Sequence, residues 1–171
     1  MNRREQTEAF ESAARDHAGI VWKIARSFTQ TPTDADDLSQ EIWLSLWRAL
    51  PKNRGDAKLS TFIYRVAFNR AVTWSRTKKR RQGAETSLFD EHTTNANPER
   101  SQGEIERIEQ LYRAIRELKE IDRAILLLSL EERSYEEISE TLGISVNAVG
   151  ARLSRAKGRL QTKLLSIASN E

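Results

Sequence analysis

Apolar side chains recur every three or four residues along most of the chain, which is the spacing of one face of an α-helix. The first such segment runs from about Thr7 to Phe28, with apolar positions at Phe10, Ala13, Ile20, Val21, Ile24 and Phe28. Stretches that alternate apolar and polar residues, as half-buried strands do, are missing from the sequence. With only seven Gly and three Pro, the pattern predicts an all-α protein.

The second segment, Thr33–Pro51, is predicted to be a helix with both ends marked. Thr33 is expected to cap its start with Asp36 as partner, and Pro51 to end it by forcing Leu50 out of helical backbone. Leu38, Ile42 and Leu46 form the core face, while acidic and aromatic residues share the rest. Two interpretations follow: a helix buried on two sides, or one that offers an acidic, aromatic-edged face to a partner helix.

A strongly basic helix is expected from Ser60, its predicted cap, to Arg81, after a polar loop over residues 52–59. It contains seven basic residues and no acid, and the aromatic residues Tyr64, Phe68 and Trp74 are interleaved with them. A basic helix end can be a solvated terminus favoured by the helix dipole. The combination of cations with aromatic rings instead favours a surface that neutralises phosphates and stacks on bases.

Residues 82–97 lose the helical periodicity and gather Gly, Thr, Asn and acids, as a flexible linker does. The expected organisation is therefore a first domain over 7–82, a linker over 83–97 and a second domain over 98–168. Pro98 is expected at the first position of a helix with Ile105, Ile108 and Leu118 on its core side. A short, nearly all-apolar helix should follow at 121–130.

The end of the chain predicts a helix-turn-helix. Ser134 and Glu137 form a capping box, Gly143 makes the turn, and Ser145 caps a last helix to about Ile167. The last helix buries Val149 and Leu153, while cations flank its small, polar opposite face. That face suits the major groove of DNA, although a plain helical hairpin closing a bundle is the simpler alternative.

Composition narrows the possible functions. The chain has 171 residues, a net charge of +3 and no Cys, which excludes disulfides and thiolate metal sites and fits a reducing compartment such as the cytoplasm. It shows no signal peptide and no apolar run of the roughly 18 residues that a membrane span needs. The two histidines, His17 and His92, are isolated, and no catalytic set or phosphate-binding Gly loop is present. We expect neither an enzyme nor a metal or cofactor site.

Four stretches together resemble the extracytoplasmic-function (ECF) sigma factors, the minimal two-domain members of the sigma-70 family. They are the segment Asp34–Trp47, the segment Ser60–Arg70, the Tyr135–Ile138 motif with Leu142-Gly143, and the segment Val149–Lys157. The resemblance covers nearly everything from Phe10 to Leu165.

The resemblance implies a sigma factor that binds core RNA polymerase and directs promoter-specific initiation, while catalysis belongs to the polymerase. The polymerase β′ clamp helices would dock on Asp36, Asp37, Gln40, Glu41, Leu44 and Trp47. The −10 element would be opened and held by Asn53, Arg54, Lys58, Arg65, Asn69, Trp74, Arg76, Lys78, Lys79 and Arg80. The −35 duplex would be read by Ser145, Asn147, Ala148, Ala151, Arg152, Ser154, Arg155 and Lys157. The β flap of polymerase and an anti-sigma factor are further implied partners.

The chain departs from the family pattern in its last helix. Gly150 and Ala151 stand where the family usually has Lys or Arg and then Ser, and Ser139 replaces the usual Ala. Glycine costs a helix about 1 kcal/mol against alanine, and here it also removes a phosphate or base contact. Two other classes compete with the sigma factor: a free-standing helix-turn-helix regulator that binds a palindrome as a dimer, and a single-strand RNA-binding module built on Tyr64–Arg81.

Overall fold

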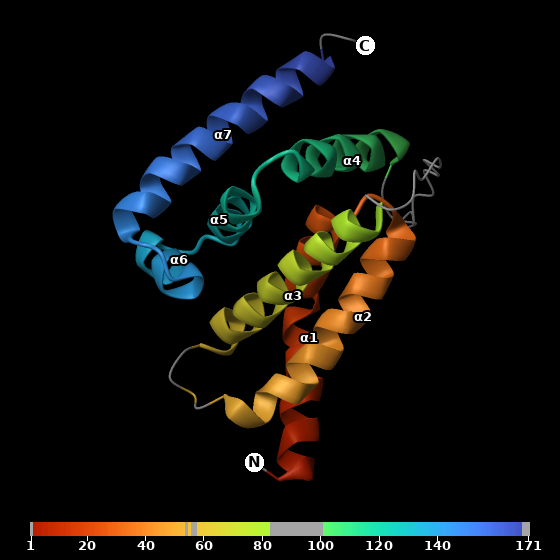
Figure 1. The fold of residues 1–171 in the computed structure, drawn as a ribbon, viewed down its shortest axis with the longest axis vertical. Helices are drawn as coiled ribbons and strands as arrows, with labels where there is room; N and C mark the ends of the chain where they lie inside the picture. The colour runs from red at the N-terminus through yellow and green to blue at the C-terminus, as the bar shows by residue number, and fades with distance from the viewer. Residues whose placement is uncertain (1, 54, 56–57, 83–100, 169–171) are drawn as a thin grey trace. The chain divides into compact units, whose positions relative to one another are not determined.

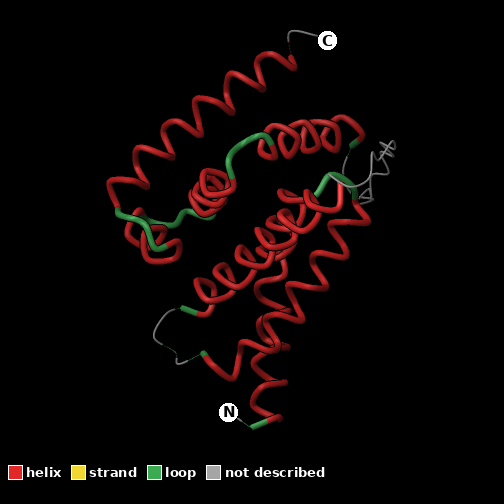
Figure 2. The backbone as a smooth tube through the Cα atoms, viewed as in Figure 1, coloured by secondary structure: helices red, strands yellow, loops and turns green. Residues whose placement is uncertain are grey.

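The regular structure of the chain is helical throughout the residues that its computed structural model describes, which are 2–53, 55, 58–82 and 101–168 (Figures 1 and 2). The chain forms two compact units, Met1–His92 and Thr93–Glu171. The predicted all-α fold with two helical parts is therefore confirmed. The expected linker over 83–97 and Pro98 lie outside the described residues, so the domain boundaries at 82 and 98 stay predictions.

The first unit is a bundle of three long helices that pack against one another in pairs. Its elements are α1 (Arg3–Phe28), α2 (Pro32–Ala49), the 3-10 turn η1 (Leu50–Lys52) and α3 (Leu59–Gln82). Figure 1 shows α1, α2 and α3 running alongside one another. The largest side chains of its core are fully buried: Val21, Ile24, Leu38, Ile42, Leu46 and Ile63. The predicted core face of α2 is thus confirmed.

The first two helices start earlier than the sequence pattern predicts. Asn2 caps α1 in a reciprocal capping box with Glu5, and each of the two backbone-to-side-chain hydrogen bonds measures 2.9 Å. In α2 the cap is Thr31, whose hydroxyl oxygen accepts a hydrogen bond from Asp34 N at 3.1 Å. Thr33 as the cap was wrong because Pro32 already occupies the first helical position, where its missing N–H costs nothing.

Two further helix ends differ from the prediction. Leu50 keeps a helical backbone, with φ −52° and ψ −42°, so Pro51 does not force it out of the helix. Instead Pro51 lies early in η1, where no N–H donor is needed, and α2 ends by tightening into this turn. Ser60 is not a cap either, because α3 begins at Leu59 and buries Ser60 in its first turn.

The described residues of the second unit, 101–168, form four helices, and α7 packs against the other three. They are α4 (Gln102–Arg116), α5 (Glu120–Leu130), α6 (Tyr135–Leu142) and α7 (Val146–Ala168). Ser101 caps α4 in a capping box with Glu104, so this helix begins at Gln102 and not at residue 98. The largest buried side chains are Ile115, Ile125, Leu126, Leu128, Ile138 and Val149.

Helices α6 and α7 form the predicted helix-turn-helix. Ser134 and Glu137 make the expected capping box, and Gly143 ends α6 in the left-handed region at φ 68°, where glycine is favoured. The Ser139 hydroxyl donates to the carbonyl oxygen of Ile144, so this residue fastens the turn in addition to being small. Ser145 caps α7, because its hydroxyl accepts from Ala148 N at 3.2 Å.

None of the helices in the described ranges combines the length and the apolar character that crossing a membrane requires.

Candidate nucleic-acid and partner-binding surfaces

One side of α3 carries cations to the surface of the first unit. Arg65, Asn69, Arg76 and Arg80 follow one another at intervals of four, seven and four residues, which places them on one stripe of the helix. Asn69, Arg76 and Arg80 are exposed and Arg65 is half-buried. Within the described part of the chain, Arg76, Arg80 and the exposed Lys79 have no ion-pair partner. Their charge is therefore available to an anionic ligand such as a phosphate backbone.

The opposite side of α3 is paired with acids of α2. Arg70 forms an ion pair with Glu41, and Lys78 forms one with Asp34. The side chains of all four residues are partly shielded from solvent. The helix itself contains no acid, but two of its seven cations are compensated by acids of the neighbouring helix.

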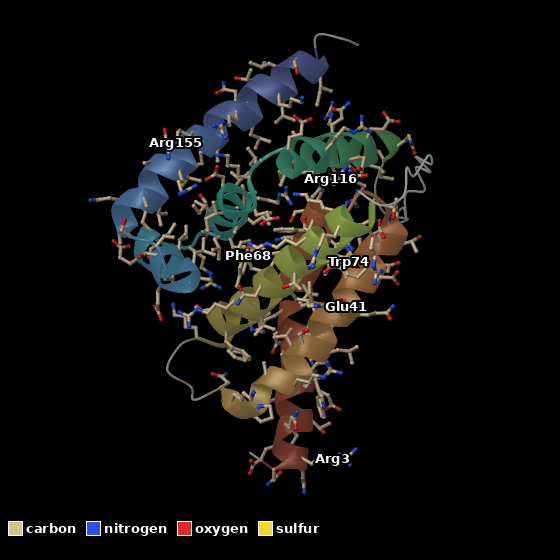
Figure 3. All side chains as sticks on the ribbon, in the orientation of Figure 1. Arg3, Glu41, Phe68, Trp74, Arg116 and Arg155 are labelled. Atoms are coloured by element: carbon tan, nitrogen blue, oxygen red, sulfur yellow. The ribbon has the colours of Figure 1, made fainter. Side chains whose placement is uncertain are left out.

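The aromatic residues of α3 mostly serve the core. Tyr64 is only 3% exposed, and the ring of Phe68 packs edge-on against Phe28 with centroids 6.0 Å apart. Trp74 is half-buried and lies four residues from both Arg70 and Lys78, hence on the side facing α2 (Figure 3). Its buried Nε1 has no acceptor among the described residues. Stacking on bases is therefore excluded for Tyr64, which is buried, and the ring of Phe68 is held against Phe28.

The loop before α3 contributes two of the residues predicted to handle the −10 element. Asn53 is half-buried and its side-chain oxygen accepts from Gly55 N at 3.2 Å, while Lys58 is exposed. Gly55 has φ 77°, a conformation that favours glycine. Arg54, which the sequence places in the same group, lies outside the described residues.

The outer face of α2 is polar with one large apolar side chain. Asp36, Asp37 and Gln40 are exposed, and Leu44 beside them is 56% exposed. Glu41 is half-buried beside α3 (Figure 3). An exposed stripe of this kind favours the second interpretation of the sequence, in which α2 packs on one side and offers the other to a partner.

Trp47, the last residue predicted for that face, belongs partly to the bundle. Its ring packs edge-on against Phe10 with centroids 5.4 Å apart, and its carbonyl oxygen accepts from Gln6 Nε2 at 2.7 Å. Trp43 packs on the same Phe10 ring at 5.6 Å. Both indoles thus join α2 to α1 and border the exposed stripe.

Most residues of α7 that are predicted to enter the major groove lie on its exposed face. Ser145, just before the helix, and five of its residues are exposed: Asn147, Ala151, Ser154, Arg155 and Lys157. Ala148 is half-buried, and Val149, Leu153 and Ala156 pack into the core on the other side. Figure 3 shows Arg155 on this helix, and in the described residues neither Arg155 nor Lys157 has an ion-pair partner. The structure thus presents small side chains and two unpaired cations together.

The other cations of α7 hold the unit together. Arg152 Nη1 lies 2.9 Å from Asp122 Oδ1, and Arg159 Nη1 lies 4.0 Å from Asp122 Oδ2. Lys163 Nζ lies 2.7 Å from Glu117 Oε2. The Asp122 side chain is only 8% exposed, so Arg152 compensates a buried charge.

Asp122 and Arg123 are structural residues that the sequence pattern did not single out, and the ion pair of Asp34 with Lys78 was not predicted either. Arg123 is buried and donates from Nη2 to the carbonyl oxygens of Arg116 at 2.6 Å and Leu118 at 3.0 Å, which satisfies the end of α4. Burial lowers the pKa of Arg123 to about 10, so it stays protonated at neutral pH. No group of His, Cys, Asp and Glu in the described residues could hold a metal ion.

Comparisons with known proteins agree with this arrangement. The model of sigma-70 region 2 matches residues 13–81, and the model of sigma-70 region 4 matches residues 108–160. The chain is 30% identical over 141 residues to the ECF RNA polymerase sigma-E factor of Escherichia coli K12, covering 77% of this chain and 74% of the relative. It is 30% identical over 133 residues to the RNA polymerase sigma factor YlaC of Bacillus subtilis, covering 76% of this chain and 77% of that one.

Solved structures with the same fold come from this family too. The sigma factor RpoE of Bartonella quintana, in complex with the anti-sigma factor NepR, superposes with a TM-score of 0.68 at 19% identity, over 95% of both chains. CnrH in complex with the cytosolic domain of CnrY gives a TM-score of 0.66 at 24% identity, over 94% of this chain and 90% of that one. Together with the matches in sequence, these findings place the chain in the sigma-70 family, as an ECF sigma factor that directs promoter-specific transcription by RNA polymerase.

Proposed function

We propose that the chain divides the work of initiation among three surfaces. The exposed face of α2 binds the β′ clamp helices of core RNA polymerase, α3 with its preceding loop opens and holds the −10 element, and α7 reads the −35 duplex. The observation that carries this proposal is the presence of an exposed cationic helix face on each of two separate units, one of them a helix-turn-helix.

The core-binding surface is supported by exposure and charge. Asp36, Asp37 and Gln40 surround the exposed Leu44, so a helix with basic edges and an apolar centre would be complementary to this stripe. Glu41 already pairs with Arg70, so a partner would have to share or displace that ion pair. Trp47 would contact the partner helix with the edge of its indole ring.

The −10 surface is supported by the stripe on α3. Arg76, Lys79 and Arg80 would hold phosphates, and Asn69 with Asn53 and Lys58 would contact unstacked bases. We leave Tyr64 and Lys78 out of this surface, because Tyr64 is buried and Lys78 forms an ion pair with Asp34. Arg65, which is half-buried at the border of the stripe, would also contact the −10 element.

The −35 surface is supported by the small and polar side chains on the exposed face of α7, which suit the major groove. Ser145, Asn147, Ala151 and Ser154 are small or polar, and Arg155 and Lys157 add charge. Polar tips on such a face reach base edges, and cations beside them reach phosphates.

Partners beyond DNA and the β′ clamp helices follow from the relatives. RpoE and CnrH were solved with NepR and with the cytosolic domain of CnrY. We infer that an anti-sigma factor also holds this chain, and that the second unit meets the β flap of polymerase. The site of action would be the cytoplasm, and bond-making chemistry would stay with the polymerase.

Reconstitution with bacterial core RNA polymerase tests this function. Holoenzyme assembled from the chain and core should give run-off transcripts from a genomic library whose start sites share paired −35 and −10 elements, whereas core alone should not. A free-standing regulator would instead bind a palindromic duplex without polymerase and yield no new transcripts. A single-strand RNA-binding module would likewise yield none, and would bind RNA without using α6 and α7.

A further inference from the structure

Ala151 lies at the centre of the exposed face of α7. It is exposed, and so are Asn147, four residues before it, and Arg155, four residues after it. Residues four apart on a helix lie one above another on the same side. The side chains of these three residues therefore follow one another in a single row of the proposed −35 surface, with a methyl group between an amide and a guanidinium.

The chain neighbours of Ala151 place no unpaired polar side chain beside it. Gly150 has no side chain, and a Cβ atom at this position would lie 3.3 Å from Cε2 of Tyr135, so an aromatic ring takes up that space. Nη1 of Arg152 lies 2.9 Å from Oδ1 of Asp122, so this guanidinium is paired with α5. The surface at Ala151 is therefore apolar, although the face around it is polar and cationic.

We propose that Ala151 reads a thymine of the −35 element, through van der Waals contact between its methyl group and the methyl group of the base. The inference rests on the proposed function of α7 as the −35 reader. Thymine presents a methyl group in the major groove, and alanine is among the residues that contact it there. The same row offers hydrogen bonds on either side, since an amide such as that of Asn147 suits adenine and a guanidinium such as that of Arg155 suits guanine.

The length of the side chain explains why alanine suits this task. Its single methyl group lets the helix approach the edge of the base closely, whereas a longer side chain would hold the helix away. Glycine at the same position would leave the thymine methyl group without contacting atoms, and such contacts are lost outright across a gap. The transfer of one such group out of water changes an affinity by about fourfold.

Deoxyuridine tests the contact, because uracil differs from thymine only in lacking the methyl group. Binding of full-length holoenzyme is measured on the promoter duplex recovered by library run-off, with each thymine of the −35 element, on either strand, replaced in turn. Wild type should lose about fourfold in affinity at one of these positions. In Ala151→Gly, thymine and uracil at that position should bind alike. Because the two bases are compared within one variant, the cost of glycine to the helix cancels.

Gln161→Gly is the matched control for this variant. Gln161 is an exposed residue of α7 outside the proposed DNA surface, so the substitution adds a glycine to the same helix without removing a base contact. It should keep the full preference for thymine. Loss of the preference in this control would show that a weakened helix, and not a missing methyl group, causes the effect, and would overturn the proposal.

Three further results would overturn it: a shared −35 element without any A·T pair, equal affinity for thymine and uracil at every position in wild type, or a preference for thymine that survives in Ala151→Gly. If wild-type holoenzyme produced no promoter-specific transcript, the proposed function itself would fail, and this inference with it. If it transcribed specifically and was insensitive to the thymine methyl groups, only the role of Ala151 would fail.

Discussion

Arg152 and Arg155 are three residues apart on α7, yet their surroundings give them different tasks. Arg152 lies 2.9 Å from the buried carboxylate of Asp122, whereas Arg155 is exposed and has no ion-pair partner in the described ranges. The sequence assigned both to DNA because both are cations of the last helix. The burial of Asp122 explains the difference between the two arginines, because a carboxylate that is removed from water needs a cation beside it.

Substituting these two arginines should therefore affect different properties. Arg152→Ala removes the nearer partner of Asp122 and leaves it only Arg159, at 4.0 Å, so it should lower the free energy of unfolding by about 1–3 kcal/mol in urea titrations. Arg155→Ala should change that free energy by less than about 0.5 kcal/mol, as surface substitutions usually do. It should instead weaken holoenzyme binding to the −35 duplex by about 1–3 kcal/mol if Arg155 reaches a base edge. Equal losses of stability in both variants would contradict the division.

Local signals in the sequence predicted the caps and the turn of the helix-turn-helix, whereas long-range pairs left no such signal. Ser134 with Glu137, Gly143 and Ser145 were identified because each acts on a neighbour within a few residues. Asp122 and Arg152 are 30 residues apart, and nothing in their local sequence links them. The cap of α2 was misplaced by two residues because Thr31 and Thr33 both suit the role, and the position of Pro32 decides it.

At the scale of single helices, α3 separates cations that are exposed, and that we propose contact DNA, from cations that face α2. Arg76 and Arg80 lie on the exposed stripe, while Lys78 forms an ion pair with Asp34. Periodicity alone contains this information, because Arg70, Trp74 and Lys78 share one side of the helix. The identity of the acids that meet them depends on how α2 packs, which the sequence of α3 does not specify.

The salt dependence of promoter binding should distinguish the two sides of α3. Arg76→Ala and Arg80→Ala should each reduce the slope of log K against log salt by about 0.9 unit, one released counterion per duplex phosphate. Lys78→Ala should change the slope much less and should cost some stability, because it leaves Asp34 without its partner. Holoenzyme binding between 50 and 200 mM salt, roughly the range in which such slopes are determined, provides the measurement. An equal slope change for all three variants would mean that Lys78 leaves Asp34 and contacts DNA.

The outer face of α2 allows a test of polymerase binding without loss of stability. Asp37→Ala combined with Leu44→Ala should weaken binding to core polymerase by more than about 1 kcal/mol, the usual threshold for an important interface residue. Both side chains are exposed, so the melting temperature should stay close to wild type. Glu41 is omitted because its removal would also release Arg70.

Glu8→Ala is a matched control for that variant, since Glu8 is an exposed acid on α1 whose side chain is 64% accessible. It should bind core polymerase as wild type does. A large fall in the melting temperature of the α2 variant would instead support the interpretation of α2 as a helix buried on two sides.

At the scale of the whole molecule, the fold class and the two helical units followed from periodicity, while the DNA surfaces needed the packed structure. The sequence gathered ten residues for the −10 element and eight for the −35 element by charge and position. Packing then removed Tyr64 from the stacking surface and tied Lys78 and Arg152 to acids. The remaining exposed residues form one smaller cationic surface on each unit, and if both bind DNA as proposed, their roles should be separable.

Permanganate footprinting of holoenzyme on a recovered promoter tests this separation most directly, because it detects unpaired thymines around −10. Asn69→Ala should reduce the reactivity of these thymines on fully paired DNA. The reactivity should recover on a template that is already mismatched at −10, because the unstacking cost of a few kcal/mol no longer has to be met there. Arg155→Ala should reduce reactivity on both templates at limiting holoenzyme, since it weakens recruitment to −35, and both losses should vanish at saturating holoenzyme. The same response of the two variants to the mismatched template would contradict the account of one surface for reading the duplex and another for opening it.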